Sequence, residues 1–194
     1  MKKNVKTWLI VIAAVLILAA LFIGPYNNLV EKEEGVKMSW SQVENQYQRR
    51  SDLILNLVET VKGYAGHESA TLTKVVEARA AATQVKVDAN TLDAESIKQF
   101  NAAQGELSQA VSRLLVTVEN YPDLKAGENF IMLQSQLEGT ENRIAFARKE
   151  FNEKANEYNT YRRRFPKNII ASIFGFDEKG YFEADNTEPV KVQF

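Results

Sequence analysis

The sequence contains no cysteine, and it has four prolines and nine glycines among its 194 residues. Without cysteine the chain forms no disulfide, offers no thiolate nucleophile and binds no metal through sulfur. The scarcity of proline and glycine favours long helices over a fold with many turns. Basic and acidic residues nearly balance, at a formal net charge of −1. Because nucleic-acid-binding proteins normally carry a basic excess, we expect no nucleic-acid partner.

Catalytic and metal-binding motifs are also scarce. His67 is the single histidine and precedes Glu68. The zinc-protease pattern H-E-x-x-H, however, needs a second histidine where this chain has Thr71. No serine lies in a G-x-S-x-G motif, and no glycine-rich phosphate loop precedes a helix. We therefore predict that the protein is not an enzyme and uses neither a cofactor nor a dedicated metal site.

The longest apolar run lies near the N-terminus. Residues 8–23 are apolar without interruption, and three lysines precede them. Counted from Val5, this stretch covers about 28 Å as a helix, close to the thickness of a bilayer core. A cleaved signal peptide, a buried core helix and a retained membrane anchor are the competing interpretations. Bulky residues end the run where signal cleavage needs small ones, which favours the anchor. The anchor residues that we single out are Trp8, Leu9, Leu16, Leu21, Phe22 and Ile23.

Charge around the apolar run predicts its orientation. Lysines precede it, whereas Glu31, Glu33 and Glu34 follow it. The positive-inside rule then places the N-terminus in the cytoplasm and the bulk of the chain outside. We divide the chain into a leader with an anchor at 1–24, a helical bundle at 25–166, and an amphipathic segment with a tail at 167–194.

A 4-3-4-3 apolar rhythm follows the anchor and predicts a long helix with one buried face. Arg50 occupies a position on this face where an apolar residue is expected, and a charge inside a packed face needs a partner. Gly63 and Gly66 weaken the helix. We therefore expect a bend or break at 63–66, with a weaker pattern continuing to about Val85. The apolar members of the face are Val36, Trp40, Val43, Tyr47, Ile54, Leu57 and Val61.

Two further helices show the same rhythm. The first runs over 94–120, with Asp93 as its expected N-cap, and Gln104 interrupts its apolar face once. Pro122 ends it, and the short connection makes the next helix, at 123–164, antiparallel. The face of that helix comprises Phe130, Leu133, Leu137, Thr140, Ile144, Ala147, Phe151, Tyr158, Tyr161 and Phe165. The predicted fold is all-α, with an N-terminal transmembrane helix followed by an elongated antiparallel bundle of three to four long helices.

Two groups of polar residues lie on these helices. The group on the first helix consists of Arg49, Arg50, Asp52 and Asn56, and the group on the third consists of Glu141, Asn142 and Arg143. We hypothesise that Arg50 enters the bundle and pairs with a carboxylate, for which Glu141 is the best candidate. Such a pair would set the register of the helices rather than perform chemistry. The alternative is that both groups are solvated faces and that Arg50 extends out to water.

Aromatic residues gather at the end of the third helix and beyond it. They are Phe151, Tyr158, Tyr161, Phe165, Phe174, Phe176, Tyr181 and Phe182. One interpretation is core packing at one end of the bundle. The other is an exposed patch for a partner or for self-association.

Several spaced motifs together make the chain resemble the LemA family of bacterial membrane proteins. They are Trp40-Ser41-Gln42-Val43, Gln48-Arg49-Arg50-x-Asp52-Leu53-Ile54, Tyr121-Pro122-Asp123-Leu124-Lys125, Glu141-Asn142-Arg143-Ile144-Ala145, Phe174-Gly175-Phe176 and Tyr181-Phe182-Glu183-Ala184. The resemblance implies a single-pass protein of the bacterial cell membrane with an elongated helical bundle and no established enzymatic activity.

The function that these observations favour is a membrane-anchored helical scaffold or adaptor, which we expect to form homo-oligomers and to work with envelope proteins. Two alternatives stay open. One is a membrane-shaping oligomer that assembles on the bilayer. The other is an accessory protein to a membrane zinc metalloprotease, an association that the family resemblance implies.

Overall fold

The computed structural model describes residues 2–64 and 69–183, with the backbone alone at 2–5, 7, 14–15, 17–21, 64 and 69. Within these residues all regular secondary structure is helical, which confirms the all-α prediction. The elements are α1 (Lys2–Tyr64), α2 (Ser69–Gln84), α3 (Ala94–Val118), α4 (Pro122–Lys125), α5 (Glu128–Arg163) and α6 (Lys167–Phe174).

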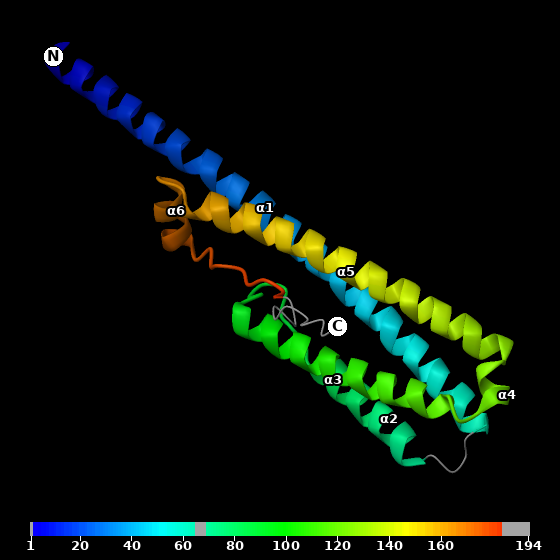
Figure 1. Cartoon of the computed structure of the whole chain (residues 1–194). Helices are drawn as coiled ribbons and strands as arrows, with labels where there is room; N and C mark the ends of the chain where they lie inside the picture. The colour runs from blue at the N-terminus through cyan, green and yellow to red at the C-terminus, as the bar shows by residue number, and fades with distance from the viewer. Residues whose placement is uncertain (1, 65–68, 184–194) are drawn as a thin grey trace, which may run out of the picture.

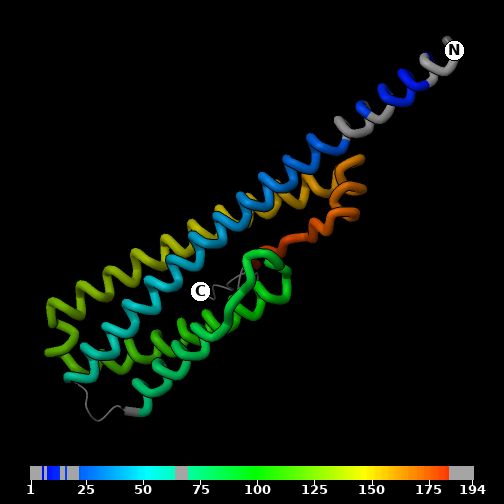
Figure 2. Tube along the Cα trace, turned by 180° about the vertical axis from the view of Figure 1, so that it is seen from behind, coloured from blue at the N-terminus to red at the C-terminus, as the bar shows by residue number. Residues whose placement is uncertain are grey.

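The long helices run up and down one elongated bundle (Figure 1). α5 returns antiparallel along the second half of α1, and α2 and α3 form a second antiparallel pair beside them. Seen from behind, the same two pairs lie side by side, and α6 packs near the middle of α1 (Figure 2). The first part of α1 projects beyond the other helices.

The buried face of α1 matches the predicted rhythm. Every apolar residue expected on that face is buried, and Leu29 extends the face by one heptad toward the N-terminus. The core divides into two apolar clusters along the bundle. The proximal cluster, nearer the projecting part of α1, lies around Trp40, Phe100 and Phe151. The distal cluster, nearer the end of α1 at Tyr64, lies around Leu57 and Leu114. Burying one such side chain contributes roughly 1.5–3 kcal/mol.

The ends of α1 and α2 and the start of α3 lie close to the positions predicted from the sequence. α1 continues through Pro25 without a break, so this proline does not start a new helix. α1 ends at Tyr64, inside the interval expected for a break, and residues 65–68 lie outside the described part. α2 ends at Gln84, and Asp93 caps α3 by accepting a hydrogen bond from the Ser96 backbone N–H at 2.7 Å.

The prediction of the third helix is wrong in two respects. The helix does not run unbroken from 123, because Gly127 is extended and separates α4 from α5. A Cβ at Gly127 would lie 3.0 Å from the Leu124 carbonyl oxygen, which favours glycine at this tight corner. Phe165 does not share the buried face, since α5 ends at Arg163 and the Phe165 side chain is 80 % exposed.

Within the part of the chain that the structure describes, no helix is both long and apolar enough to span a membrane. The expected anchor at residues 8–23 stays a prediction. The side chain of Leu21 lies outside the described residues. The other five side chains that we singled out for the anchor are exposed along the projecting part of α1, and they are Trp8, Leu9, Leu16, Phe22 and Ile23.

Candidate functional site

Arg50 lies inside the bundle and is 4 % exposed. The 4-3 spacing of α1 leaves it no other direction, because Tyr47 and Ile54, its neighbours on the same face, are both buried. A guanidinium removed from water in this way needs partners for its N–H groups. Three come from two other helices.

Both terminal nitrogens of Arg50 donate hydrogen bonds. Nη1 donates to the Ser108 hydroxyl and to Glu141 Oε1, each at 3.1 Å. Nη2 donates to the Gln104 backbone carbonyl at 3.3 Å and also to the side-chain oxygen of Gln104. The guanidinium lies 4.8 Å from the ring centroid of Tyr47, which adds a cation–π contact. Burial raises the pKa of the Tyr47 hydroxyl.

We call Arg50, Gln104, Ser108 and Glu141 the polar layer. It also reaches α2, since Gln104 Nε2 donates to the Ala82 backbone carbonyl at 3.5 Å. The polar layer separates the two apolar clusters on α1, α3 and α5 alike. A single polar level in an apolar bundle is a known means of specifying helix register. The geometry is that of a positioning element, with one carboxylate side chain 52 % exposed at its rim.

The structure does not bring all the predicted polar residues together. Asp52 is exposed, and its Oδ1 lies 3.9 Å from Nη2 of Arg79 on α2. Arg143 is exposed and donates to the Thr140 hydroxyl at 3.0 Å. Arg49, Asn56 and Asn142 are exposed. Of the seven residues in the two predicted polar groups, Arg50 and Glu141 are therefore the two that pair across helices between the groups, with Arg50 buried and Glu141 at the rim.

Gln104 and Ser108 belong to the polar layer, although the sequence hypothesis did not include them. A signal for Gln104 was present, because it is the one polar interruption of the α3 face. Arg50 and Gln104 are thus the matching breaks of two apolar faces. Ser108 gave no such signal, since serine on a helix surface is common.

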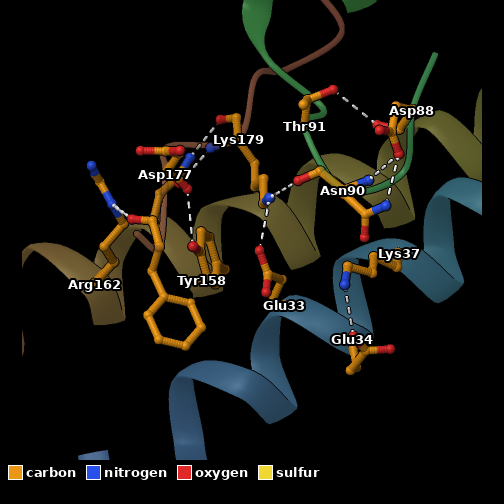
Figure 3. Close-up of polar contacts among 12 residues, drawn as sticks. Glu33, Glu34, Lys37, Asp88, Asn90, Thr91, Tyr158, Arg162, Asp177 and Lys179 are labelled. Carbon is orange, nitrogen blue, oxygen red and sulfur yellow. Dashed lines mark hydrogen bonds and ion pairs between the residues drawn. The ribbon is translucent and has the colours of Figure 1, made fainter. Parts of the chain in front are cut away.

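A second buried cation lies near the end of the bundle from which the first part of α1 projects. Lys179 is 1 % exposed and belongs to the extended segment 176–183 that follows α6. Its Nζ lies 2.9 Å from Glu33 of α1 and donates to the Asn90 backbone carbonyl at 2.8 Å (Figure 3). It therefore ties this segment both to α1 and to the loop between α2 and α3.

Two asparagines of α5 hold the main chain of the same segment. Asn159 donates to the Lys179 carbonyl at 2.7 Å and accepts from the Lys179 N–H at 3.0 Å. Asn152 does the same for Phe182, at 2.8 and 2.9 Å. The two asparagines are seven residues apart on α5, and the two residues that they hold are three apart along the segment. Seven helical residues and three extended residues both span about 10 Å, so the two distances match. We call residues 176–183, with these partners, the C-terminal clasp.

Further contacts complete the C-terminal clasp. Tyr158 donates to the Asp177 carbonyl at 2.9 Å, and Arg162 Nε donates to the Phe176 carbonyl at 2.7 Å (Figure 3). Burial, followed by the negative charge of Glu33, raises the pKa of the Tyr158 hydroxyl. Gly180 allows a close approach, since a Cβ there would lie 2.6 Å from the Ala94 Cα.

The aromatic residues divide between core and surface. Phe151, Tyr158, Phe176 and Phe182 are buried, and Trp40 stacks on Phe182 with ring centroids 5.9 Å apart. Phe165 and Phe174 are exposed. The core interpretation therefore holds for the buried members, and contact of the exposed members with a partner or a second copy stays a prediction. Lys179, Asn152 and Asn159 gave no pattern in the sequence.

Metal-binding side chains do not gather in the described part of the chain, where no group of three or more histidine, cysteine, aspartate and glutamate residues is placed to hold an ion. His67 and Glu68 lie outside the described residues. The polar layer and the C-terminal clasp are built from cation–carboxylate pairs and amides, which position backbone and helices.

Comparison with known proteins identifies the family. The LemA family model matches residues 39–194, a region that contains the polar layer and the C-terminal clasp. The chain belongs to the LemA family. Glu33, the partner of Lys179, lies just before the matched region of this LemA-family chain.

Individual relatives are similar at modest identity. Protein LemA of Metamycoplasma hominis is 23 % identical over 172 residues, which is 89 % of this chain and 75 % of the relative. Magnetosome protein MamQ 2 of Paramagnetospirillum magneticum is 29 % identical over 175 residues, and MamQ of Magnetospirillum gryphiswaldense is 26 % identical over 174. For both MamQ proteins the match covers 81 % of this chain and 64 % of the relative, which is less than two thirds of their length.

Proposed function

We propose that this LemA-family chain is a non-enzymatic scaffold or adaptor, anchored in the bacterial cell membrane by residues 8–23 with its bundle outside the cytoplasm. The observation that carries the proposal is the continuity of α1. One helix of 63 residues, about 95 Å long, joins an exposed apolar portion to the face that organises the bundle core. A rod of this kind holds a surface at a set distance from its anchor.

Exposed apolar side chains support the anchoring part of the proposal. Large apolar surfaces that face solvent mark contacts with a membrane or another protein. Trp8, Leu9 and Leu16 are each more than half exposed on the projecting part of α1. The charge pattern around the run supports the orientation, through the positive-inside rule.

Extraction of membranes at alkaline pH tests the anchor. Wild-type chain is expected in the pellet after a carbonate wash. Leu16→Lys is expected to move a large fraction to the supernatant, because lysine at the centre of a spanning helix costs about 2.5–3.5 kcal/mol. Met132→Lys, which makes the same change at an exposed position of α5, is the matched control. Release of the wild-type chain would contradict the proposal.

Orientation is tested separately with reporters fused after Phe194. A phosphatase that is active only outside the cytoplasm should give signal, and a fluorescent protein that matures only inside should not. The reverse pattern would overturn the proposed topology and leave the anchor intact.

Self-association and partners are the adaptor part of the proposal. Because the chain has no cysteine, a single cysteine at exposed Phe146 of α5 reports contacts by crosslinking in cells. We expect a crosslinked homo-oligomer, together with envelope partners that mass spectrometry identifies. Recovery of a membrane zinc metalloprotease would favour the accessory role. A monomer without partners would contradict the scaffold.

A second candidate function is a membrane-shaping oligomer that assembles on the bilayer; the relatives named as magnetosome proteins do not test it. Purified full-length chain, reconstituted into liposomes and imaged by electron microscopy, separates the two. Tubulated or constricted vesicles would support membrane shaping, and unchanged vesicles at the same protein density would support the scaffold.

A further inference from the structure

α6 lies beside α1 where α1 leaves the bundle (Figures 1 and 2). It packs on the bundle through Ile170 and Ala171, which are buried. Tyr26 of α1 contacts the ring of Phe174 at the end of α6, with centroids 4.9 Å apart. Tyr26 directly follows the apolar stretch of α1, so α6 is held at the exit of the proposed anchor.

The surface of α6 that the bundle leaves uncovered carries an apolar stripe, flanked by the exposed polar residues Asn168 and Ser172. Phe165, Ile169 and Ile173 follow one another at intervals of four residues and are 80 %, 45 % and 63 % exposed. Residues four apart on a helix share a side, so Ile169 and Ile173 form one stripe. On α1, Phe22 and Ile23 are exposed just before Tyr26. Apolar surface is therefore available on both helices at this level of the molecule.

Positive charge lies at the N-terminal end of the stripe. Arg163 and Arg164 are exposed, and Lys167 holds its Nζ 3.9 Å from the centroid of the Tyr161 ring. Residues 163–174 contain no aspartate or glutamate. Asp177 lines a pocket together with Arg163 and Asn168, but the cations outnumber it. Apolar side chains beside a run of cations suit the headgroup region of an anionic bilayer.

We propose that residues 163–174 form a membrane seat, in which α6 lies in the headgroup region of an anionic bilayer and orients the bundle relative to it. The inference rests on the proposed anchor at residues 8–23. Three apolar side chains and three cations are too few to hold a protein on a bilayer by themselves. The seat therefore acts on a bundle that α1 already tethers, and it fixes the tilt of the rod.

Fluorescence quenching in liposomes tests the membrane seat. The chain has no cysteine, so Ile173→Cys carries one environment-sensitive label in the full-length protein. Met132→Cys, at a similarly exposed position near the start of α5, is the matched control. The proteins are reconstituted into vesicles of phosphatidylglycerol and phosphatidylcholine that contain a lipid-borne quencher. We expect at least fivefold stronger quenching at position 173 than at position 132.

The outcomes separate the membrane seat from the anchor on which it rests. Flotation of the vesicles is measured first, and protein that does not float overturns both. Protein that floats but shows equal quenching at the two positions overturns the seat alone. A label at position 173 that becomes shielded with rising protein concentration, without quenching by lipid, shows that a second copy covers α6 and also overturns the seat.

Charge is tested with Arg163→Gln, Arg164→Gln and Lys167→Gln combined in the Ile173→Cys background. In anionic vesicles this variant should lose at least half of the quenching, and in pure phosphatidylcholine it should match its parent. Lys149→Gln at an exposed site on α5 is the control. Equal quenching of variant and parent in anionic vesicles would overturn the proposed role of anionic lipid.

Discussion

Arg50 in the polar layer and Lys179 in the C-terminal clasp are both buried cations paired with a carboxylate, but different backbones carry them. Arg50 projects from α1 into a level where four helices meet. Lys179 projects from the segment 176–183, which runs from α6 to the loop between α2 and α3 and contributes Phe176 and Phe182 to the apolar core. We therefore expect the loss of Arg50 to weaken contacts among all four helices. We expect the loss of Lys179 to act first on the C-terminal clasp, through its contacts with α1 and the loop between α2 and α3.

The partners differ in a second way. The side chain of Glu141 is half exposed, so water can solvate it when its cation is removed. Glu33 is mostly buried and faces Lys179 together with a loop carbonyl. At the polar layer, the group that would lose its partner inside the core is the side-chain oxygen of Gln104. The following experiments use these differences.

Arg50→Met should have the largest effect. It removes the charged donor of the polar layer and leaves the buried side-chain oxygen of Gln104 without its partner. Hydrogen bonds to a charged group contribute about 1.5–3 kcal/mol each, so losing those to Gln104 and Glu141 costs about 3–6 kcal/mol. Urea unfolding measured by circular dichroism should show a lower midpoint for the whole bundle. Arg49→Met removes the same charge from the exposed neighbouring position and should change stability by less than about 0.5 kcal/mol. Equal midpoints for the two variants would show that the polar layer does not stabilise the fold.

Lys179→Met should have a smaller and local effect. It strands Glu33 and the Asn90 carbonyl, which costs about 2–3 kcal/mol, but the C-terminal clasp can open without unfolding the helices. Hydrogen exchange should therefore rise in residues 176–183 and stay unchanged in α3. Lys149→Met, which removes a surface ion pair, is the control. A uniform rise over all helices would remove the distinction between the two cations.

Asn159→Ala should also loosen the C-terminal clasp, with a smaller effect than Lys179→Met. It removes both hydrogen bonds to the Lys179 backbone, worth about 1–2 kcal/mol together. Asn156→Ala, at an exposed position one turn earlier on α5, makes the same truncation without touching the segment. Limited proteolysis should cleave near residue 180 faster in the first variant than in the second. Equal rates would show that the asparagine contacts do not secure the segment.

Tyr158→Phe should have the smallest effect, and it should depend on pH. The folded pKa is raised, mainly by burial, so the fold favours the neutral phenol. The contribution of the Tyr158 hydroxyl to the free energy of unfolding is complete below the pKa of the unfolded chain, near 10. It declines as the pH rises above that value. Between pH 9 and 11, the midpoint of unfolding should fall less steeply in Tyr158→Phe than in wild type. Parallel curves would show that this tyrosine does not contribute to the alkaline loss of stability.

Periodicity predicted the helical parts of the molecule because a buried helix face repeats every three or four residues. It located the α1 face from Val36 to Val61 and marked Arg50 and Gln104 as breaks in their helices. It did not predict the corner at Gly127, where local backbone geometry interrupts an otherwise helical pattern. It also misassigned Phe165, because the end of α5 removes that residue from the helical repeat.

The sequence by itself determined the helical class, the principal buried faces and the positions where those faces carry polar groups. These features depend on neighbours within one helix, so their spacing along the chain records them. Tertiary structure alone decided which polar groups share a level and where the C-terminal clasp docks. The burial of Lys179 depends on Glu33 and Asn90, which are 146 and 89 residues away along the chain. No local pattern encodes a contact between such distant residues, because it arises only when the helices and the loop have assembled.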